Sequence, residues 1–265
     1  VGSSSNAEME RLIEQKREHG VFMTVLGFGM GNYKDDKMEI IADKGNGNYA
    51  YIDNIQEARK VFITEFGGTL FTIAKDVKFQ MEFNPARVKG YRLVGYENRL
   101  LNDEDFNDDK KDAGEMGAGH TVTALYEIIP AGSDEALKSI DPLKYQSNRD
   151  GSKASKKVEA DPRAELMTVK LRYKQPDGNT STKVEIPVKG KVLDLEDTSD
   201  NFRFSASIAE FGLLLRNSEF KADATMEEVI AMAKEARGED DEGYRSEFIK
   251  LVRLADSLKE WSAEK

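Results

Sequence analysis

The stretch that decides the fold of the N-terminal part is Val21-Phe22-Met23-Thr24-Val25-Leu26, followed directly by the glycine-rich Gly27-Phe28-Gly29-Met30-Gly31-Asn32. A short, nearly continuous apolar run is typical of a strand that is buried on both faces of a parallel sheet. A loop rich in glycine then allows backbone angles that other residues avoid. We therefore expect a parallel strand that ends at this loop.

The residues on either side alternate between helix and strand patterns. Before the strand, Ser5 or Asn6 can cap a helix that ends before Gly20. After the loop, a second helix is predicted to begin at Asp35 or Asp36, and a short strand follows at Tyr49 to Ile52. The sequence also predicts a third helix with apolar residues at helical spacing from Ile55 to Phe66, which Gly67-Gly68 should end. Residues 1–66 are thus expected to be the closing part of a doubly wound α/β sheet, although two strands cannot complete such a sheet.

From Thr69 the apolar period changes to two, which indicates antiparallel strands. The strand candidates are Val77 to Phe83, Tyr91 to Tyr96, His120 to Ile129, Glu165 to Lys174 and Thr182 to Val188. Pro176-Asp177-Gly178-Asn179 predicts a hairpin turn between the last two. About six short strands favour a β-sandwich over residues 67–198. The polar stretch from Ala131 to Pro162 is interpreted as a long mobile excursion.

The helical period returns after Asp194, so residues 199–265 are predicted to be helical. Thr225 and Glu228 have the spacing of a capping box, in which each residue bonds to the other's backbone N–H. We expect the helices to pack on the sandwich through a set of apolar side chains, namely Phe204, Ile208, Phe211, Phe248, Leu251 and Leu258. The predicted fold class is therefore α+β: a partial α/β segment, an antiparallel sandwich and C-terminal helices.

Composition excludes several classes of function. Asp and Glu outnumber Lys and Arg by 49 to 39 in 265 residues, so nucleic acid would meet net repulsion. No apolar run reaches the roughly 20 residues that cross a bilayer, and the first residues do not have the pattern of a signal peptide. Because cysteine is absent, thiol nucleophiles, thiolate metal sites and disulfides are excluded.

Neither the glycine-rich loop nor the two histidines indicate a catalytic or cofactor site. The G-x-G-x-x-G register that starts at Gly27 ends on Asn32, and no Gly-Lys-Ser/Thr follows, so no nucleotide site is predicted. His19 and His120 are the only histidines. Because there is no G-x-S-x-G nucleophile motif, a packing role is favoured for His120. We predict no catalytic residue and no bound cofactor in this chain.

The one candidate ion site is an acidic loop between strands, residues 102–112. Its carboxylates Asp103, Asp105, Asp108 and Asp109 are hard oxygen ligands of the kind that calcium prefers. An EF-hand frame starting at Asp105 would, however, place Lys110 at the turn glycine and Met116 at the closing glutamate. We therefore predict a solvated loop, with calcium binding as the alternative.

A family resemblance rests on longer stretches. Thr24 to Asp35 and Gly45 to Ile52 resemble the C-terminal third of a bacterial von Willebrand factor type A domain. Gly95 to Arg99, Asp105 to Asp109 and Asp112 to Glu127 are similar to the uncharacterised domain that follows it in those proteins. The family implies a metal-ion-dependent adhesion site with an Asp-x-Ser-x-Ser loop. Ser3-Ser4-Ser5 does not match that loop, so the ligands of Mg or Ca are expected upstream of Val1 and no residue here is assigned to metal.

The resemblance implies a non-catalytic binding, adhesion or scaffolding part of an exported bacterial protein. It implies a periplasmic or cell-surface location and a protein or surface ligand. Self-association through the incomplete α/β segment is also expected. Two alternatives stay open: a hydrolase that uses His120 and the acidic loop, and a purely structural spacer or assembly module.

Overall fold

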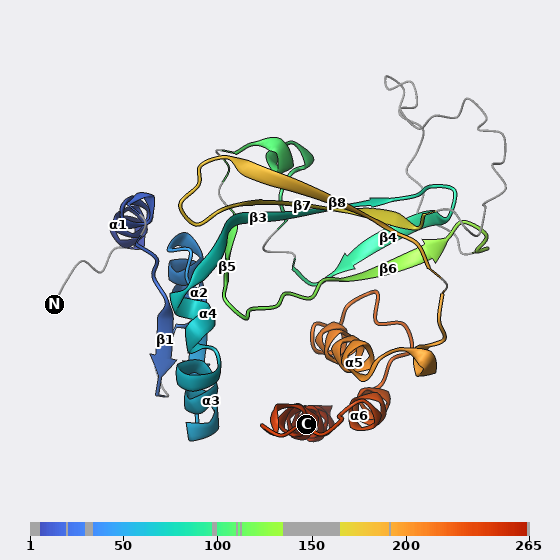
Figure 1. The fold of residues 1–265 in the computed structure, drawn as a ribbon. Coiled ribbons are helices and arrows are strands. Elements are labelled where there is room, and N and C mark those ends of the chain that lie inside the picture. Colours follow the sequence, from blue (N-terminus) through green and yellow to red (C-terminus); the bar gives the residue numbers. More distant parts are fainter. Residues whose placement is uncertain are drawn as a thin grey trace, which may run out of the picture. The chain divides into compact units, whose positions relative to one another are not determined.

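The computed structural model describes residues 6–19, 21–29, 34–96, 100–109, 111, 113–134, 165–190 and 192–263. The chain divides into two compact units, which are drawn together in Figure 1 and described separately below. Unit 1 comprises Val1–Asn84, Leu100–Val122 and Met167–Val188. Unit 2 comprises Pro85–Arg99, Thr123–Leu166 and Lys189–Lys265.

The first part of unit 1 has the predicted order of helices and strands. It contains α1 (Asn6–Glu18), β1 (Val25–Phe28), α2 (Asp35–Lys44), β2 (Tyr49–Ile52) and α3 (Ile55–Arg59). β1 and β2 pair in parallel from Val25 opposite Tyr49 to Phe28 opposite Ile52. α2 ends at Gly45, whose N–H donates to the carbonyl groups of Ile41 and Ala42. The sequence thus predicted the order and the parallel pairing correctly.

Two details of this segment correct the predictions. β1 occupies Val25–Phe28 and not the apolar run from Val21, and the side chains of Val21, Phe22 and Met23 are 55%, 38% and 41% exposed. Two strands provide too few neighbours to bury that run on both faces. Gly67 and Gly68 do not end the third helix either. A π-helical turn (Lys60–Thr64) follows α3, and α4 (Phe66–Leu70) runs through both glycines.

Gly68 lies within α4 because it makes a close backbone contact with Gly117, and this contact leaves no room for a side chain. A Cβ on Gly117 would lie 1.5 Å from the carbonyl oxygen of Gly68. Next to this contact, Ala118 N–H donates to the Phe71 carbonyl at 2.8 Å. The glycines therefore allow α4 to approach β5 (Gly114–Gly117).

Unit 1 also contains a four-stranded antiparallel sheet with the order β5-β3-β7-β8. It contains β3 (Thr72–Phe83), β5, β7 (Met167–Lys174) and β8 (Ser181–Val188). β7 lies between β3 and β8 (Figure 1). The predicted hairpin between β7 and β8 is confirmed, and Gly178 N–H donates to Gln175 in its turn. β5 was not predicted, because its glycines interrupt the alternating pattern.

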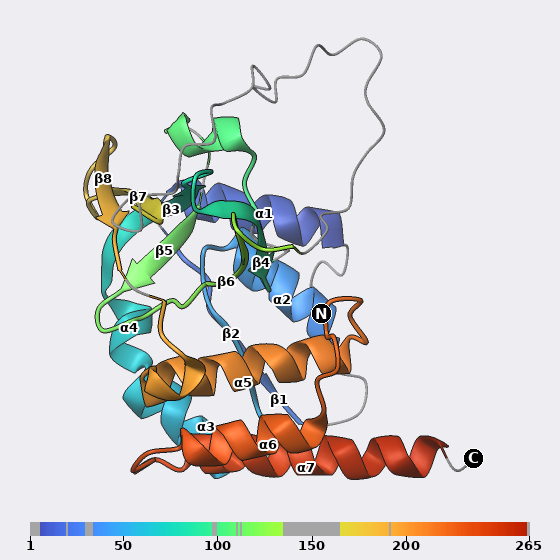
Figure 2. The same ribbon diagram turned by 90° about the vertical axis from the view of Figure 1, so that its right-hand side faces the viewer.

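The described part of unit 2 contains two strands and three helices of at least ten residues. β4 (Val88–Val94) pairs with β6 (Leu125–Pro130) in an antiparallel ladder. The predicted strand from His120 therefore begins five residues later, at Leu125. The helices α5 (Asp200–Leu215), α6 (Met226–Glu235) and α7 (Tyr244–Ala263) lie side by side (Figure 2). The capping box of α6 is formed as predicted, by Thr225 and Glu228.

The core of unit 2 lies between these helices. Val229, Ala233 and Val252 have no exposed surface. Phe248 packs against both buried clusters, with its ring 5.4 Å from that of Phe204 and 5.6 Å from that of Phe211. These three aromatic residues thus connect α5 with α7 through ring contacts.

The other three residues that were predicted to pack on the sandwich are not buried. Ile208, Leu251 and Leu258 are 47%, 54% and 56% exposed. Helical spacing alone had placed them on the buried stripe, but the positions of the neighbouring helices decide which residues are covered. Packing of the helices on a sandwich through these three side chains is therefore not what the structure shows.

The sequence-based boundaries 66/67 and 198/199 also differ from the two units. β3 pairs with β5 and β7, whereas β4 pairs with β6, so the strands expected in one domain divide between two units. A sandwich domain with the bounds 67–198 is therefore not confirmed, although every strand pair from β3 onward is antiparallel. Most of the predicted mobile excursion, residues 135–162, lies outside the described residues. None of the described helices is both long and apolar enough to cross a bilayer.

Candidate functional site

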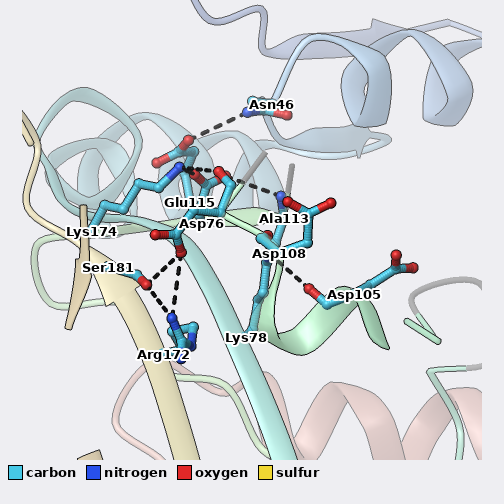
Figure 3. A network of polar contacts seen from close by, with 11 residues as sticks. Asn46, Asp76, Lys78, Asp105, Asp108, Ala113, Glu115, Arg172, Lys174 and Ser181 are labelled. Atoms are coloured by element: carbon cyan, nitrogen blue, oxygen red, sulfur yellow. Dashed lines mark hydrogen bonds and ion pairs between the residues drawn. The ribbon is translucent and has the colours of Figure 1, made fainter. Parts of the chain in front are cut away.

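The acidic loop packs against the sheet of unit 1 near an irregularity in β3. The register of β3 shifts between Lys75 and Lys78, and Asp76 adopts a positive φ of 49°. A bulge of this kind redirects the side chain of the extra residue. The Asp76 carboxylate accepts from the backbone N–H of Ala113 at 3.2 Å and forms an ion pair with Lys174 (Figure 3). It thereby connects the end of the loop to β7.

The ammonium group of Lys78 holds the middle of the loop. Lys78 is 2% exposed and donates to the backbone carbonyl oxygens of Asp105 and Asp108, at 3.1 and 2.5 Å. Figure 3 shows the Lys78 side chain directed at this turn. A buried charged group is tolerated only where hydrogen bonds compensate its lost hydration. Calcium sites in loops commonly use backbone carbonyl oxygens as ligands. Here the carbonyl oxygens of Asp105 and Asp108 accept hydrogen bonds from Lys78 instead.

A second cationic group, the guanidinium of Arg172, holds the loop at Asp109. Its Nη1 lies 3.5 Å from Oδ1 of Asp109 and donates to the Ser181 hydroxyl at 2.7 Å. That hydroxyl donates in turn to Oδ1 of Asp109 at 2.5 Å, and Lys174 donates to the Asp109 carbonyl oxygen at 2.7 Å. The hydrogen bond from Ser181, with the nearby charges of Arg172 and Lys174, lowers the pKa of Asp109 although burial opposes it. Asp109 is thus ionised and partnered.

Asp105 has a local structural role at the start of the loop. It lies in the short 3-10 helix η3 (Asp103–Asn107), and its carboxylate accepts from the backbone and side-chain nitrogens of Asn102 at 3.3 and 3.0 Å. Lys111 lies 3.5 Å away. Burial acts to raise the pKa of Asp105, but the Asn102 hydrogen bonds and the Lys111 charge outweigh it and lower the pKa. The side chain of Asp103 lies outside the described part of the molecule.

The structure brings Asp105 and Asp109 into one polar network, but through cations of the sheet and not around a shared carboxylate centre. Across the described part of the chain, no three acidic or histidine side chains gather as a metal site would require. Calcium binding at this loop stays a prediction to be tested in solution. The geometry shows a loop whose negative charges and carbonyl groups face lysine and arginine.

The two histidines lie apart from this network. The imidazole of His120 is exposed, and none of the hydrogen bonds and ion pairs found among the described residues involves it. His19 closes the last turn of α1, with Nδ1 2.7 Å from the carbonyl oxygen of Gln15. No observation links His120 to Asp105 or Asp109 as a hydrolase would need.

Sequence reasoning missed the cations that organise the loop. Lys170, Arg172 and Lys174 occur at every second position of β7, so their side chains share one face of the sheet. Lys78 is the direct partner of Arg172 in the neighbouring strand. In the sequence, the alternation of basic residues along β7 indicated that one face of this strand is positively charged. Which loop they would face depends on the pairing of β3 with β7.

The parallel pair β1–β2 is a second candidate site. Its two strands form a sheet of their own among the described residues. Parallel strands normally lie inside larger sheets with both faces covered, and an unpaired strand edge offers N–H and C=O groups to another strand. Phe28, at the end of β1, is 59% exposed. This part of unit 1 is therefore open to added strands and to apolar cover.

Comparison with known proteins places most of the chain in one family. The family model described as "Uncharacterized protein YfbK, C-terminal" matches residues 68–258. The chain belongs to this family. It is also 42% identical over 258 residues to the "Uncharacterized protein YfbK" of Escherichia coli (strain K12), across 97% of this chain and 43% of that protein. The chain thus spans less than half the length of this curated relative.

The match to the YfbK C-terminal family leaves β1 and β2 outside, because it begins at residue 68, whereas the acidic loop and its cations lie inside it. A solved structure, the "Crystal structure of the ArnB paralog VWA2 from Sulfolobus acidocaldarius", is similar over 88% of this chain and 50% of that chain. The sequence identity is 12% and the TM-score is 0.39.

Proposed function

We propose that this chain is a non-catalytic binding or scaffolding part of a longer, exported bacterial protein of von Willebrand factor A type. In this proposal, strands from another segment of the longer protein complete the sheet that β1 and β2 begin. A metal-dependent adhesion site with Mg or Ca belongs to that other segment, and the ligand it binds is a protein or a surface. The periplasm or the cell surface is the proposed location.

The open parallel pair β1–β2 carries this proposal. A helix lies on either side of β1 in sequence, and β2 follows α2 as in a doubly wound sheet, yet among the described residues this parallel sheet has only two strands. The length of the E. coli relative supports it, since more than half of that protein lies outside the aligned region. The acidic loop contributes to structure in this proposal, because the cations of the sheet already engage it.

Complementation tests the proposal. The chain is mixed with the portion of the E. coli relative that lies outside the aligned region, and the mixture is examined by light scattering and amide hydrogen exchange. We expect a one-to-one complex in which the amides of Val25–Phe28 and Tyr49–Ile52 exchange more slowly. Phe28→Asp should weaken the complex, because it places a charge where apolar cover is needed.

A matched control uses Ile186→Asp. Ile186 is also an exposed apolar residue, 53% exposed, but it lies in β8 of the other sheet. It should leave complex formation unchanged. The proposal is refuted if no complex forms, or if both variants weaken it equally. A stable self-associated form of the chain alone, with the same amides protected, would instead favour a purely structural assembly module.

A further inference from the structure

A large apolar groove lies entirely within unit 2. It has a volume of about 920 Å³ and opens between the β4–β6 strand pair and the helices α5 and α6. Arg92 and Tyr126 line the strand side, and Leu213 and Met232 line the helix side. The β1–β2 pair belongs to unit 1, so this groove is a separate surface.

The helix side of the groove is shaped by small residues. Ala206 and Ala209 are one turn apart on α5, and Ala231 lies on α6. Alanine leaves room for a polypeptide to approach the helix backbone. Leu213, Met232 and Phe220 supply larger apolar side chains, of which methionine adapts readily to different partners. The shape and lining suit a protein segment with an apolar face.

Acidic residues outnumber basic residues in the lining of the groove. Glu210 on α5 is half-buried, and no hydrogen bond or ion pair to its carboxylate is found among the residues that the structure describes. Glu228 on α6 also lines the groove, and one of its oxygens accepts from Thr225 in the capping box. Burial, together with the charge of Glu228, raises the pKa of Glu210. These two carboxylates repel each other beside an apolar surface.

The basic residues of the groove already have partners other than Glu210 and Glu228. Arg92 forms an ion pair with Glu127 on the neighbouring strand and stacks over the Phe220 ring at 4.0 Å. Arg203 pairs with Asp200 and donates to two backbone carbonyl groups. Lys221 donates to an asparagine side chain at 2.7 Å. None of these three basic side chains pairs with Glu210 in the described contacts.

We propose that this groove binds an amphipathic segment of a partner protein, with a lysine or arginine placed between Glu210 and Glu228. The apolar face of the segment contacts Leu213, Met232 and Phe220, and the alanines accommodate its backbone. The net charge of the chain, −10, attracts such a basic segment and increases its rate of association.

The test uses a designed peptide, because the partner is unidentified. A fluorescent helical peptide carries leucines on one face and lysines on the other, and its matched control carries glutamate at every lysine. Binding to the whole chain is followed by anisotropy in physiological salt. We expect the lysine peptide to bind and the glutamate peptide to fail.

Three variants distinguish the groove from general charge attraction. Glu210→Gln should weaken binding about tenfold, a size expected for one half-buried charge pair. Ala209→Trp should block binding by filling the groove. Glu227→Gln removes the same charge from an exposed position on α6 that does not line the groove, and should leave binding unchanged. Glu210→Gln should unfold at the same or a higher temperature than the natural chain, which separates lost binding from lost folding.

Four results would overturn the proposal: no binding of the lysine peptide at millimolar concentration, equal binding of both peptides, equal weakening by Glu210→Gln and Glu227→Gln, or unchanged binding by Ala209→Trp. A dimer of the chain that Ala209→Trp dissociates would also overturn it, because the occupant would then be a second copy.

Discussion

Replacing Lys78 by methionine should release the acidic loop from the sheet of unit 1. Methionine keeps most of the apolar stem of lysine but removes the ammonium group that donates to Asp105 and Asp108. The two carbonyl groups then lose a donor in a place that water reaches poorly, since Lys78 is 2% exposed. The change therefore tests hydrogen bonding more than packing.

The magnitude follows from the two hydrogen bonds. A hydrogen bond to a charged group contributes roughly 1.5 to 3 kcal/mol, and partial rehydration of the loop recovers some of it. We expect the free energy of unfolding to fall by about 3 kcal/mol. At roughly 2 to 4 °C per kcal/mol, the midpoint should drop by about 6 to 12 °C.

Thermal and urea unfolding measure this change, and hydrogen exchange over Asp103–Asn107 reports whether the loop is released. Lys189→Met is the matched control. Its ammonium pairs with Glu165 at 3.4 Å on the surface, with 64% of the lysine side chain exposed. This control should cost less than about 0.5 kcal/mol. Equal midpoints for Lys78→Met and the natural chain, with unchanged exchange in the loop, would refute the reasoning.

The remaining predictions concern the helices and the same loop. Phe248→Ala removes the ring shared by both helix clusters and should lower the free energy of unfolding of unit 2 by about 3 kcal/mol in urea unfolding. Thr225→Ala removes the α6 cap and should cost about 1 kcal/mol in the same assay, a loss that Thr225→Ser should largely spare. Millimolar calcium should leave the unfolding midpoint unchanged, and a rise that Asp105→Asn with Asp109→Asn abolishes would establish a calcium site. The pKa of Asp109 is lowered in the folded state, so its stabilising contribution is present above the ordinary aspartate pKa and is lost as the pH falls through the folded value. Ser181→Ala removes a hydrogen bond that lowers this pKa, so the loss of stability should move to higher pH. NMR titration of Asp109 measures the shift.

Local patterns in the sequence determined the helices and the tight turns. Asp35 begins α2, Gly45 ends it, and Thr225 with Glu228 caps α6. The turn at Gly178 joins β7 to β8 as predicted. These features depend on residues three or four positions apart, so their hydrogen bonds form within one short segment.

Contacts between residues distant in sequence were decided only by the tertiary structure. β3 pairs with β7 some ninety residues later, and this pairing places Lys78 beside Arg172 and brings both to the acidic loop. The sequence showed the carboxylates but not the cations that hold them, because an isolated strand pattern does not specify its partner. The same limit applies to α7, where helical spacing predicted that Leu251 is buried. Val252 is fully buried and Leu251 is more than half exposed, because the neighbouring helices cover only one of them.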